Sequence, residues 1–459
     1  MAASVIVLLT LVSCGARTDD DPDRHNGLTP IAISDATATI PSTVEVTQPA
    51  VTAEESDVAS RIASAVEATQ IAATVEAAVE ATVTAAALSS ESRRGAFIRA
   101  LEFLPDNPEI RAGVLVNDYQ SARELFGIDS PPLDPTDNQI LEYVNRLIGP
   151  GTTGLSTNST IDGFGRRRDD VAGWRSALGF TAADVNLSVV AGSDPKIYEI
   201  LTGKFVWPLI YLAIMNDQVW SPELEETSHN GFEFFSWGED YRPNLRMSDD
   251  AVRTLGRGHR LLVIDEILFW TLGSPEMRSL IDASSGKESA LALNDDFRVL
   301  ANTMDAESAY AGLLTNETPS LAAGAGLAEG GYGLSDMAYD QALRTLGPIA
   351  VGRYDAYGIG ASFDGQDNIL TIALLYSDEA SALNNLNAVE KMVAYQLDVG
   401  ESLLGRVSWS EVLGVPKLPT ESHVNIRLDG RVVVVNIKTS RATTWATMTT
   451  EYDHLIFHR

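Results

Sequence analysis

The chain contains no Phe, Trp or Tyr before Phe97, and this absence limits what its first fifth can fold into. Aromatic side chains bury large apolar areas and dominate the energetics of protein cores. Residues 15–93 carry instead 13 acidic residues and four arginines among many Ala and Thr. Such a segment cannot bury enough apolar surface to offset the entropy lost when it becomes ordered. We therefore expect residues 14–93 to form a tether rather than a domain.

The expected tether has two halves of different composition. Residues 34–52, SDATATIPSTVEVTQPAVT, are rich in Ser, Thr and Pro, which indicates an extended linker. Residues 56–87 are rich in Ala and Glu, with Val or Ile at positions 58, 62, 66, 71, 75, 79 and 83. A spacing of about four residues drifts around a helix, so it makes a poor coiled-coil seam. This half predicts a partly helical spacer, with self-association through the aliphatic stripe as the alternative.

Cys14 is the only cysteine in the sequence. It follows an apolar run, Val5 to Val12, that is too short to span a bilayer and is placed like the apolar region of a signal peptide. Residues 11–15, LVSCG, resemble the bacterial lipobox, which has an aliphatic residue three before the cysteine and a small residue directly before it. The resemblance implies that residues 1–13 are a cleaved lipoprotein signal peptide. It also implies that Cys14 receives a diacylglyceryl group and anchors the chain at the extracytoplasmic face of the cell membrane.

Charge and cysteine content exclude several classes of function. Lys and Arg number 33 against 63 Asp and Glu, so the formal net charge is −30. Such a field repels phosphate backbones, which argues against a nucleic-acid partner. A single cysteine allows neither an intrachain disulfide nor a Cys/His zinc cluster, and the six histidines are scattered. We therefore expect no metal and no cofactor.

The compact part begins near Phe97 and shows alternating strand and helix patterns. We expect a first α+β domain over residues 94–321 and a C-terminal α+β domain over 334–459, separated by the Gly-rich loop 322–333. The strongest local signal is HVNIRL-DG-RVVVVNIK, which predicts a two-residue hairpin with Val424, Ile426 and Leu428 on the same face as Val433 and Val435. The patterns together predict an α+β fold, with antiparallel sheets and helices packed on one face.

Two long apolar runs belong to the first expected domain. Residues 205–215, FVWPLIYLAIM, are apolar throughout and too short for a membrane span, so they predict a buried helix. Residues 260–270, RLLVIDEILFW, are nearly all apolar and predict a strand region with Asp265 and Glu266 inside it.

Residues 231–241, GFEFFSWGEDY, are the candidate binding stretch. On a strand, Phe232 and Phe234 point to one face and the next aromatic residues to the other. If only the first face is core, an aromatic and acidic platform for a sugar or peptide results, made of Phe235, Trp237, Glu239, Asp240 and Tyr241. The alternative is a central strand buried on both faces.

The sequence contains no local catalytic signature: GxSxG, HExxH and a complete EF-hand loop are all missing. We therefore name no catalytic residue, and a catalytic site assembled from distant residues stays open.

The order of lipobox, Ala/Thr/Glu-rich tether and α+β region resembles uncharacterised bacterial cell-surface lipoproteins. The segment 289–304, SALALNDDFRVLANTM, is similar to a helix entry found in such proteins. The resemblance implies a lipid-anchored envelope protein that presents a binding or scaffolding domain to a cell-wall or surface-protein partner. Two alternatives are an envelope hydrolase with a non-local catalytic site and a solute-binding lipoprotein.

Overall fold

The computed structural model describes residues 95–132, 135–148, 153, 155, 171–217, 221–244, 256–319, 344, 350–398, 408–416, 423–450, 455, 456 and 458. The predicted signal peptide, Cys14, the tether and the Gly-rich loop 322–333 lie outside these residues. Contacts divide the chain into Met1–Arg93 and Arg94–Arg459, and all the described residues belong to the second unit.

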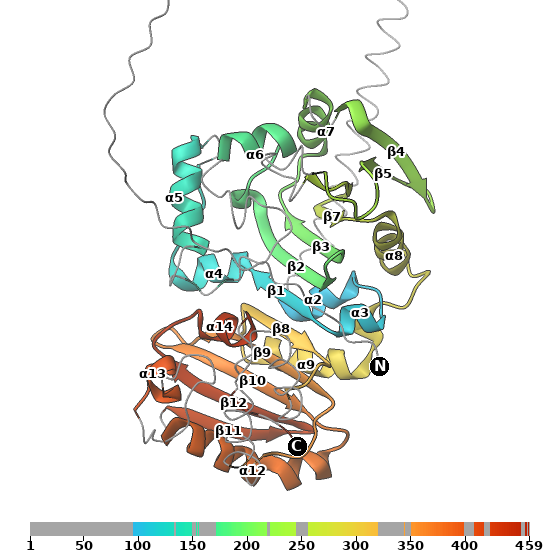
Figure 1. Cartoon of the computed structure of the whole chain (residues 1–459). Helices are drawn as coiled ribbons and strands as arrows, with labels where there is room; N and C mark the ends of the chain where they lie inside the picture. Colours follow the sequence, from blue (N-terminus) through green and yellow to red (C-terminus); the bar gives the residue numbers. More distant parts are fainter. Residues whose placement is uncertain are drawn as a thin grey trace, which may run out of the picture. The chain divides into compact units, whose positions relative to one another are not determined.

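The described strands form one 12-stranded sheet in the order β11-β12-β10-β9-β8-β1-β2-β3-β7-β6-β5-β4. All neighbouring strands are antiparallel, which confirms the predicted α+β class with antiparallel pairing. The strands are β1 (Val114–Asp118), β2 (Val185–Ser193), β3 (Lys196–Gly203), β4 (Leu224–His229), β5 (Phe232–Trp237), β6 (His259–Ile264), β7 (Ile267–Thr271), β8 (Ala311–Thr315), β9 (Ala356–Phe363), β10 (Asn368–Leu375), β11 (Val424–Asp429) and β12 (Val432–Thr439). Figure 1 shows the sheet running from β4 at the upper end to β11 at the lower end.

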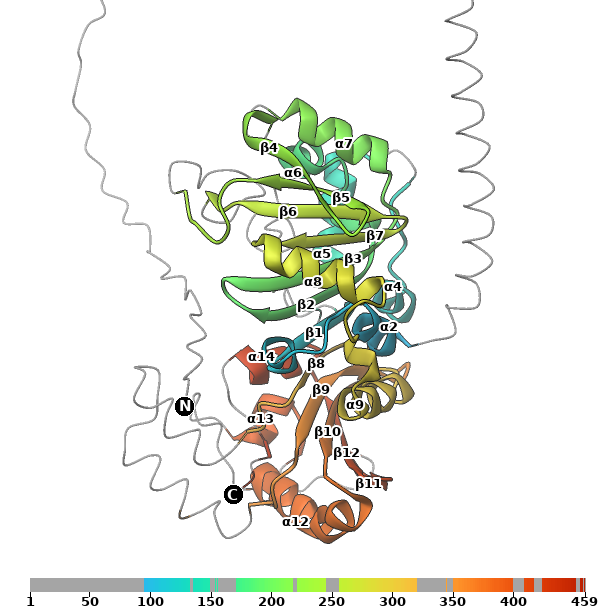
Figure 2. The same cartoon turned by 90° about the vertical axis from the view of Figure 1, so that its right-hand side faces the viewer.

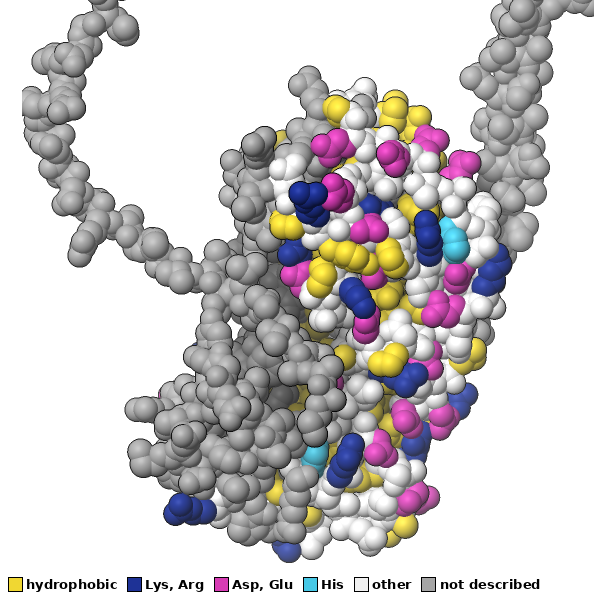
Figure 3. Space-filling model, turned by 45° about the vertical axis from the view of Figure 1, so that its right-hand side comes forward, with side chains coloured by type: hydrophobic (Ala, Val, Ile, Leu, Met, Phe, Trp, Pro, Cys, Tyr) yellow, Lys and Arg dark blue, Asp and Glu magenta, His cyan; other side chains and the backbone are white. Residues whose placement is uncertain are grey.

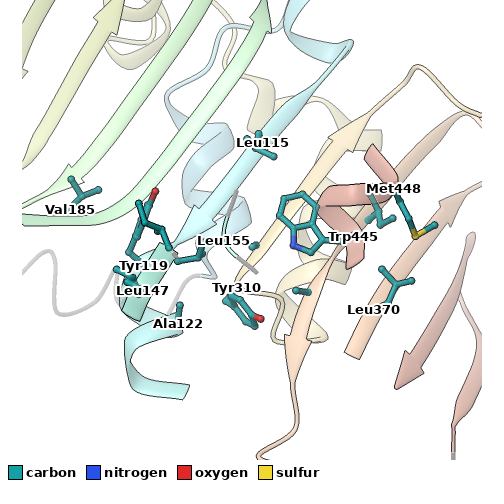
Figure 4. Packing of buried hydrophobic residues seen from close by; sticks show 14 of the residues in the cluster. Leu115, Tyr119, Ala122, Leu147, Leu155, Val185, Tyr310, Leu370, Trp445 and Met448 are labelled. Carbon is teal, nitrogen blue, oxygen red and sulfur yellow. The ribbon is translucent and has the colours of Figure 1, made fainter. Parts of the chain in front are cut away.

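The sheet continues across the boundary that we expected between two α+β regions. β1 pairs with β8, and β8 pairs with β9, so strands from both regions are joined by backbone hydrogen bonds. The core is shared as well: one buried cluster contains Leu115 and Tyr119 together with Trp445 and Met448 (Figure 4).

The α-helices are α2 (Ala96–Glu102), α3 (Pro108–Arg111), α4 (Tyr119–Phe126), α5 (Asp137–Ile148), α6 (Val171–Leu178), α7 (Trp207–Asn216), α8 (Ser274–Ser284), α9 (Asp295–Ala306), α12 (Glu379–Asp398), α13 (Trp409–Leu413) and α14 (Thr444–Thr450). Helices cover both faces of the sheet rather than one. The α5 face carries α4, α5, α6, α7, α12, α13 and α14, and the α9 face carries α2, α3, α8 and α9. In Figures 1 and 2, α4, α5 and α6 lie on the opposite side of the upper strands from α8.

The strand alternation explains why both faces need helices. Along β1, Leu115 belongs to the core of the α5 face, whereas Val114 and Val116 belong to the core of the α9 face. A strand that is apolar at every position must bury side chains on both sides. Helices on one face alone would leave half of these side chains in water.

The predicted C-terminal hairpin is present, with a small change of register. Its two loop residues are Gly430 and Arg431 instead of Asp429 and Gly430. Gly430 has a φ of +55° at the first central position, where the hairpin turns of the mirror-image types require a positive φ. The pairing shifts by two residues, so each side chain keeps its face, and Ile426 lies opposite Val435 as the predicted shared face requires.

A pair of glycines lets two helices approach the α9 face. Gly312 on β8 lies directly opposite Gly360 on β9. A Cβ on Gly360 would stand 2.3 Å from the carbonyl oxygen of Ala311 and 2.7 Å from the Cε of Met304 on α9. A Cβ on Gly312 would stand 3.1 Å from the ring of Phe97 on α2. The missing side chains therefore make room for α2 and α9.

Replacing Gly360 with alanine should lower the free energy of unfolding by about 1–3 kcal/mol, because the new methyl group meets backbone that cannot move without disturbing the sheet. The matched control is Gly358→Ala on the same strand and face, where the nearest atoms would be 3.4 Å away, an ordinary contact. We expect the control to change stability by less than about 1 kcal/mol. Chemical denaturation of both variants checks this, and equal losses would contradict it.

Candidate binding surface

The candidate stretch 231–241 alternates as predicted, but both of its faces are covered. Phe234 belongs to the core of the α9 face, and Phe235 and Trp237 belong to the core of the α5 face. Their exposed fractions are 2%, 4% and 1%. The indole of Trp237 packs at 5.6 Å, edge to face, against Trp270 and lies near the imidazole of His259. Trp237 is therefore a core residue, as the alternative of a strand buried on both faces expects.

Asp240 belongs to an ion cluster and not to an aromatic platform. Its carboxylate pairs with Arg260 and accepts hydrogen bonds from the backbone N–H of Ser274 at 3.0 Å and its hydroxyl at 3.1 Å. The Arg260 side chain is only 4% exposed, and this burial lowers the pKa of its guanidinium. The cluster ties the loop after β5 to the beginning of α8.

All five N–H donors of Arg260 are already used. Nε donates to the Ser274 hydroxyl at 2.8 Å, and Nη1 donates to the carbonyls of Trp237 and His259 at 3.0 and 2.8 Å. Nη2 donates to the carbonyl of Gly238 at 3.1 Å and to Asp240. A guanidinium has no further donor to offer to a ligand. Arg260 therefore has a structural role, and the cluster is no anion-binding site.

The side chains of the two remaining predicted residues, Tyr241 and Glu239, contact different partners. The hydroxyl of Tyr241 contacts both carboxylate oxygens of Glu276, at 2.8 and 2.7 Å. Burial is the main cause that raises the pKa of Tyr241, and the hydrogen bond to Glu276 raises it further. Burial also raises the pKa of Glu276. Glu239 is exposed and pairs with the exposed Arg242, at 2.7 Å. The structure thus does not assemble the five predicted side chains into one surface.

The helix that we expected to be buried carries the most exposed apolar surface in this region. In α7, only Ile210 and Ile214, one turn apart, point into the core. On the same helix and the residue before it, the exposed large apolar side chains are Val206 (51%), Trp207 (39%), Leu209 (53%), Leu212 (53%) and Met215 (39%). The expectation of burial was therefore wrong. The helix is only partly buried because one of its sides packs on the sheet and on α6, while the other side faces solvent.

Two side chains connect this exposed helix to the predicted stretch. The indole of Trp207 stacks on the ring of Phe235 at 5.3 Å with an interplanar angle of 24°, and Tyr211 lies 5.8 Å from the same ring. Phe235 is thus the buried support beneath Trp207 and has little surface of its own. The exposed aromatic residue beside the stretch 231–241 is therefore Trp207, on the neighbouring helix.

Carboxylates border this apolar surface. Glu226 on β4 lies directly opposite Phe235, and Glu233 on β5 lies opposite Ser228, so both glutamates share the α7 side of the sheet. Both are exposed, as is Glu223, which belongs to a short helical turn that contacts α7. The basic residue nearest to α7 in the sequence is Lys204, which is exposed. Figure 3 shows hydrophobic side chains at the upper end of the described surface with acidic side chains beside them.

The region around α7 offers an apolar surface for a non-covalent contact. The described residues hold no group of three or more His, Cys, Asp or Glu side chains able to hold a metal ion. Among the described helices, none has both the length and the apolar character that a membrane span requires. What the region offers is an apolar helix with a buried aromatic support and an acidic border. We call the side chains of Val206, Trp207, Leu209, Leu212 and Met215 the α7 surface.

Comparison with known proteins adds little. No family model matches the chain, and the curated proteins give no match either. Two crystal forms of TP0453 are similar in structure, each with a TM-score of 0.33. Crystal form I has 8% sequence identity and covers 77% of this chain, crystal form III has 9% and covers 76%, and 97% of TP0453 is matched in both. A likeness this weak carries no argument about fold or function.

Proposed function

We propose that the chain is a lipid-anchored protein of the extracytoplasmic face of a bacterial membrane, and that its globular unit binds a partner through the α7 surface. The observation that carries the binding role is the set of five large apolar side chains, 39–53% exposed, four of them on α7 and one on the residue before it. Soluble proteins rarely expose large contiguous apolar patches unless these bind something. The lipobox resemblance at Cys14 supports the anchor.

The contacts of the polar groups favour binding over hydrolysis. Arg260, Asp240 and Ser274 satisfy one another, and Tyr241 is held by Glu276. The Ser274 hydroxyl donates to a carboxylate that is already paired with Arg260, and every donor of Arg260 is used, so Arg260 has no donor left to stabilise charge that develops on a substrate. The exposed parts of the apolar side chains, by contrast, lose their contact with water only when another molecule covers them.

Cys14→Ser should move the protein from the membrane fraction to the soluble fraction, because a serine hydroxyl cannot form the thioether. The control is Ser13→Ala, which keeps a small residue before the cysteine and should leave the protein with the membrane. Fractionation of bacteria expressing each form, followed by immunoblotting, measures the distribution. Membrane retention of Cys14→Ser would overturn the anchor.

A further inference from the structure

The acidic border of the α7 surface constrains what can cover it. Glu226 and Glu233 are exposed on the same side of the sheet as α7, and the exposed Glu223 belongs to the helical turn that contacts α7. A molecule that lies on Leu209 and Leu212 therefore meets carboxylates at the edge of the contact. Burying these carboxylates without a partner of opposite charge is costly.

We infer that the α7 surface binds a cationic amphipathic segment of another polypeptide, one with an apolar face flanked by Lys or Arg. The inference rests on the binding role proposed above and names the chemistry of the partner. The apolar face of the segment would cover the α7 surface, and its basic side chains would reach Glu226 and Glu233. This pairing satisfies both parts of the surface, since apolar area supplies most of the affinity and complementary charge supplies orientation and specificity.

Two other occupants fit less well. A second copy of the chain would place the same acidic border against itself, and each chain already carries a net charge of −30. Like charges brought together at an interface oppose association. A lipid surface favours helices whose polar side is rich in Lys and Arg. Helix α7 contains no charged residue, and glutamates border it, so anionic lipid headgroups are repelled.

The direct test uses two synthetic 18-residue peptides with the same leucine positions, one with lysine and the other with glutamate at every remaining position. Binding to the purified full chain is measured by isothermal titration calorimetry in 0.15 M salt. Vesicles of phosphatidylcholine, with and without phosphatidylglycerol, are tested by flotation of the Cys14→Ser chain, which lacks the acceptor for the lipid anchor. We expect the Leu/Lys peptide to bind at least tenfold more tightly than the Leu/Glu peptide, with no binding to either vesicle.

Variants separate a specific contact from attraction between any base and an acidic protein. Leu209→Asp with Leu212→Asp makes the chain more negative, so unspecific attraction would increase, whereas the proposed contact should weaken at least tenfold. Leu383→Asp is the control, because Leu383 is a leucine of α12 that is 58% exposed. The double variant Glu226→Gln with Glu233→Gln should lower the affinity for the Leu/Lys peptide about threefold to tenfold. Leu209→Ser with Leu212→Ser repeats the first test without adding charge.

Several results would overturn the inference. One is equal affinity for both peptides, and another is peptide affinity that neither leucine variant lowers. Vesicle flotation that depends on Leu209 and Leu212 would point to a lipid surface instead. Self-association that both leucine variants abolish would point to a second copy of the chain. The calorimetry does not depend on Cys14, so retention of Cys14→Ser in the membrane fraction would refute the anchor alone. Circular dichroism confirms that each variant is folded before its affinity is compared.

Discussion

Asp240→Ala is expected to lower the free energy of unfolding by about 3 kcal/mol. The change removes the carboxylate opposite Arg260, whose side chain is 4% exposed, and so leaves a buried guanidinium without its counter-charge. Breaking a buried ion pair by removing one partner costs about 3–5 kcal/mol. The lower end applies here because the Asp240 side chain is 35% exposed, and water partly replaces it. Urea denaturation of the purified protein measures the loss.

The neighbouring acid provides the control for this prediction. Glu239 pairs with Arg242 on the surface, where both side chains are at least 70% exposed. Pairs of this kind add little to stability, so Glu239→Ala should leave the denaturation midpoint unchanged within error. If the two variants behaved alike, the cluster around Arg260 would not hold the loop after β5. Both residues looked equivalent in the sequence, as acids beside an aromatic strand.

The local parts of the fold could be predicted from the sequence. The hairpin of β11 and β12 follows from alternating aliphatic residues around a Gly-containing turn, both of which are short-range signals. Strand order could not be predicted in this way. β1 pairs with β8, almost 200 residues later, and no pattern within either strand specifies that neighbour. One sheet instead of two therefore emerges only when all the strands are placed.

The apolar runs show a second limit of sequence reasoning. In residues 260–270, which we read as a single strand region, Asp265 and Glu266 form the turn between β6 and β7, and Asp265 has a φ of +53°. In α7, residues on the inner and outer sides are equally apolar, so the pattern that usually marks an exposed face is missing. Whether Leu209 or Ile210 is covered depends on how many elements surround the helix. That number is a property of the whole fold.

Trp237→Ala and Trp207→Ala should separate core from surface in the candidate region. Trp237 is 1% exposed and packs against Trp270, so its removal leaves a large cavity and should cost about 3–5 kcal/mol. Trp207 is 39% exposed, stacks on Phe235 and lies edge-to-face against Tyr211 at 6.0 Å, and its removal leaves no buried cavity, so its loss should cost about 1–2 kcal/mol. Peptide affinity should change in the opposite order. Trp207→Ala should lower the affinity for the Leu/Lys peptide, whereas Trp237→Ala should leave the affinity of the folded fraction unchanged. Thermal denaturation and calorimetry on both variants measure the two quantities. A stable Trp237→Ala protein that no longer binds the peptide would contradict this assignment. It would show that the buried indole on β5 contributes to recognition more than to packing.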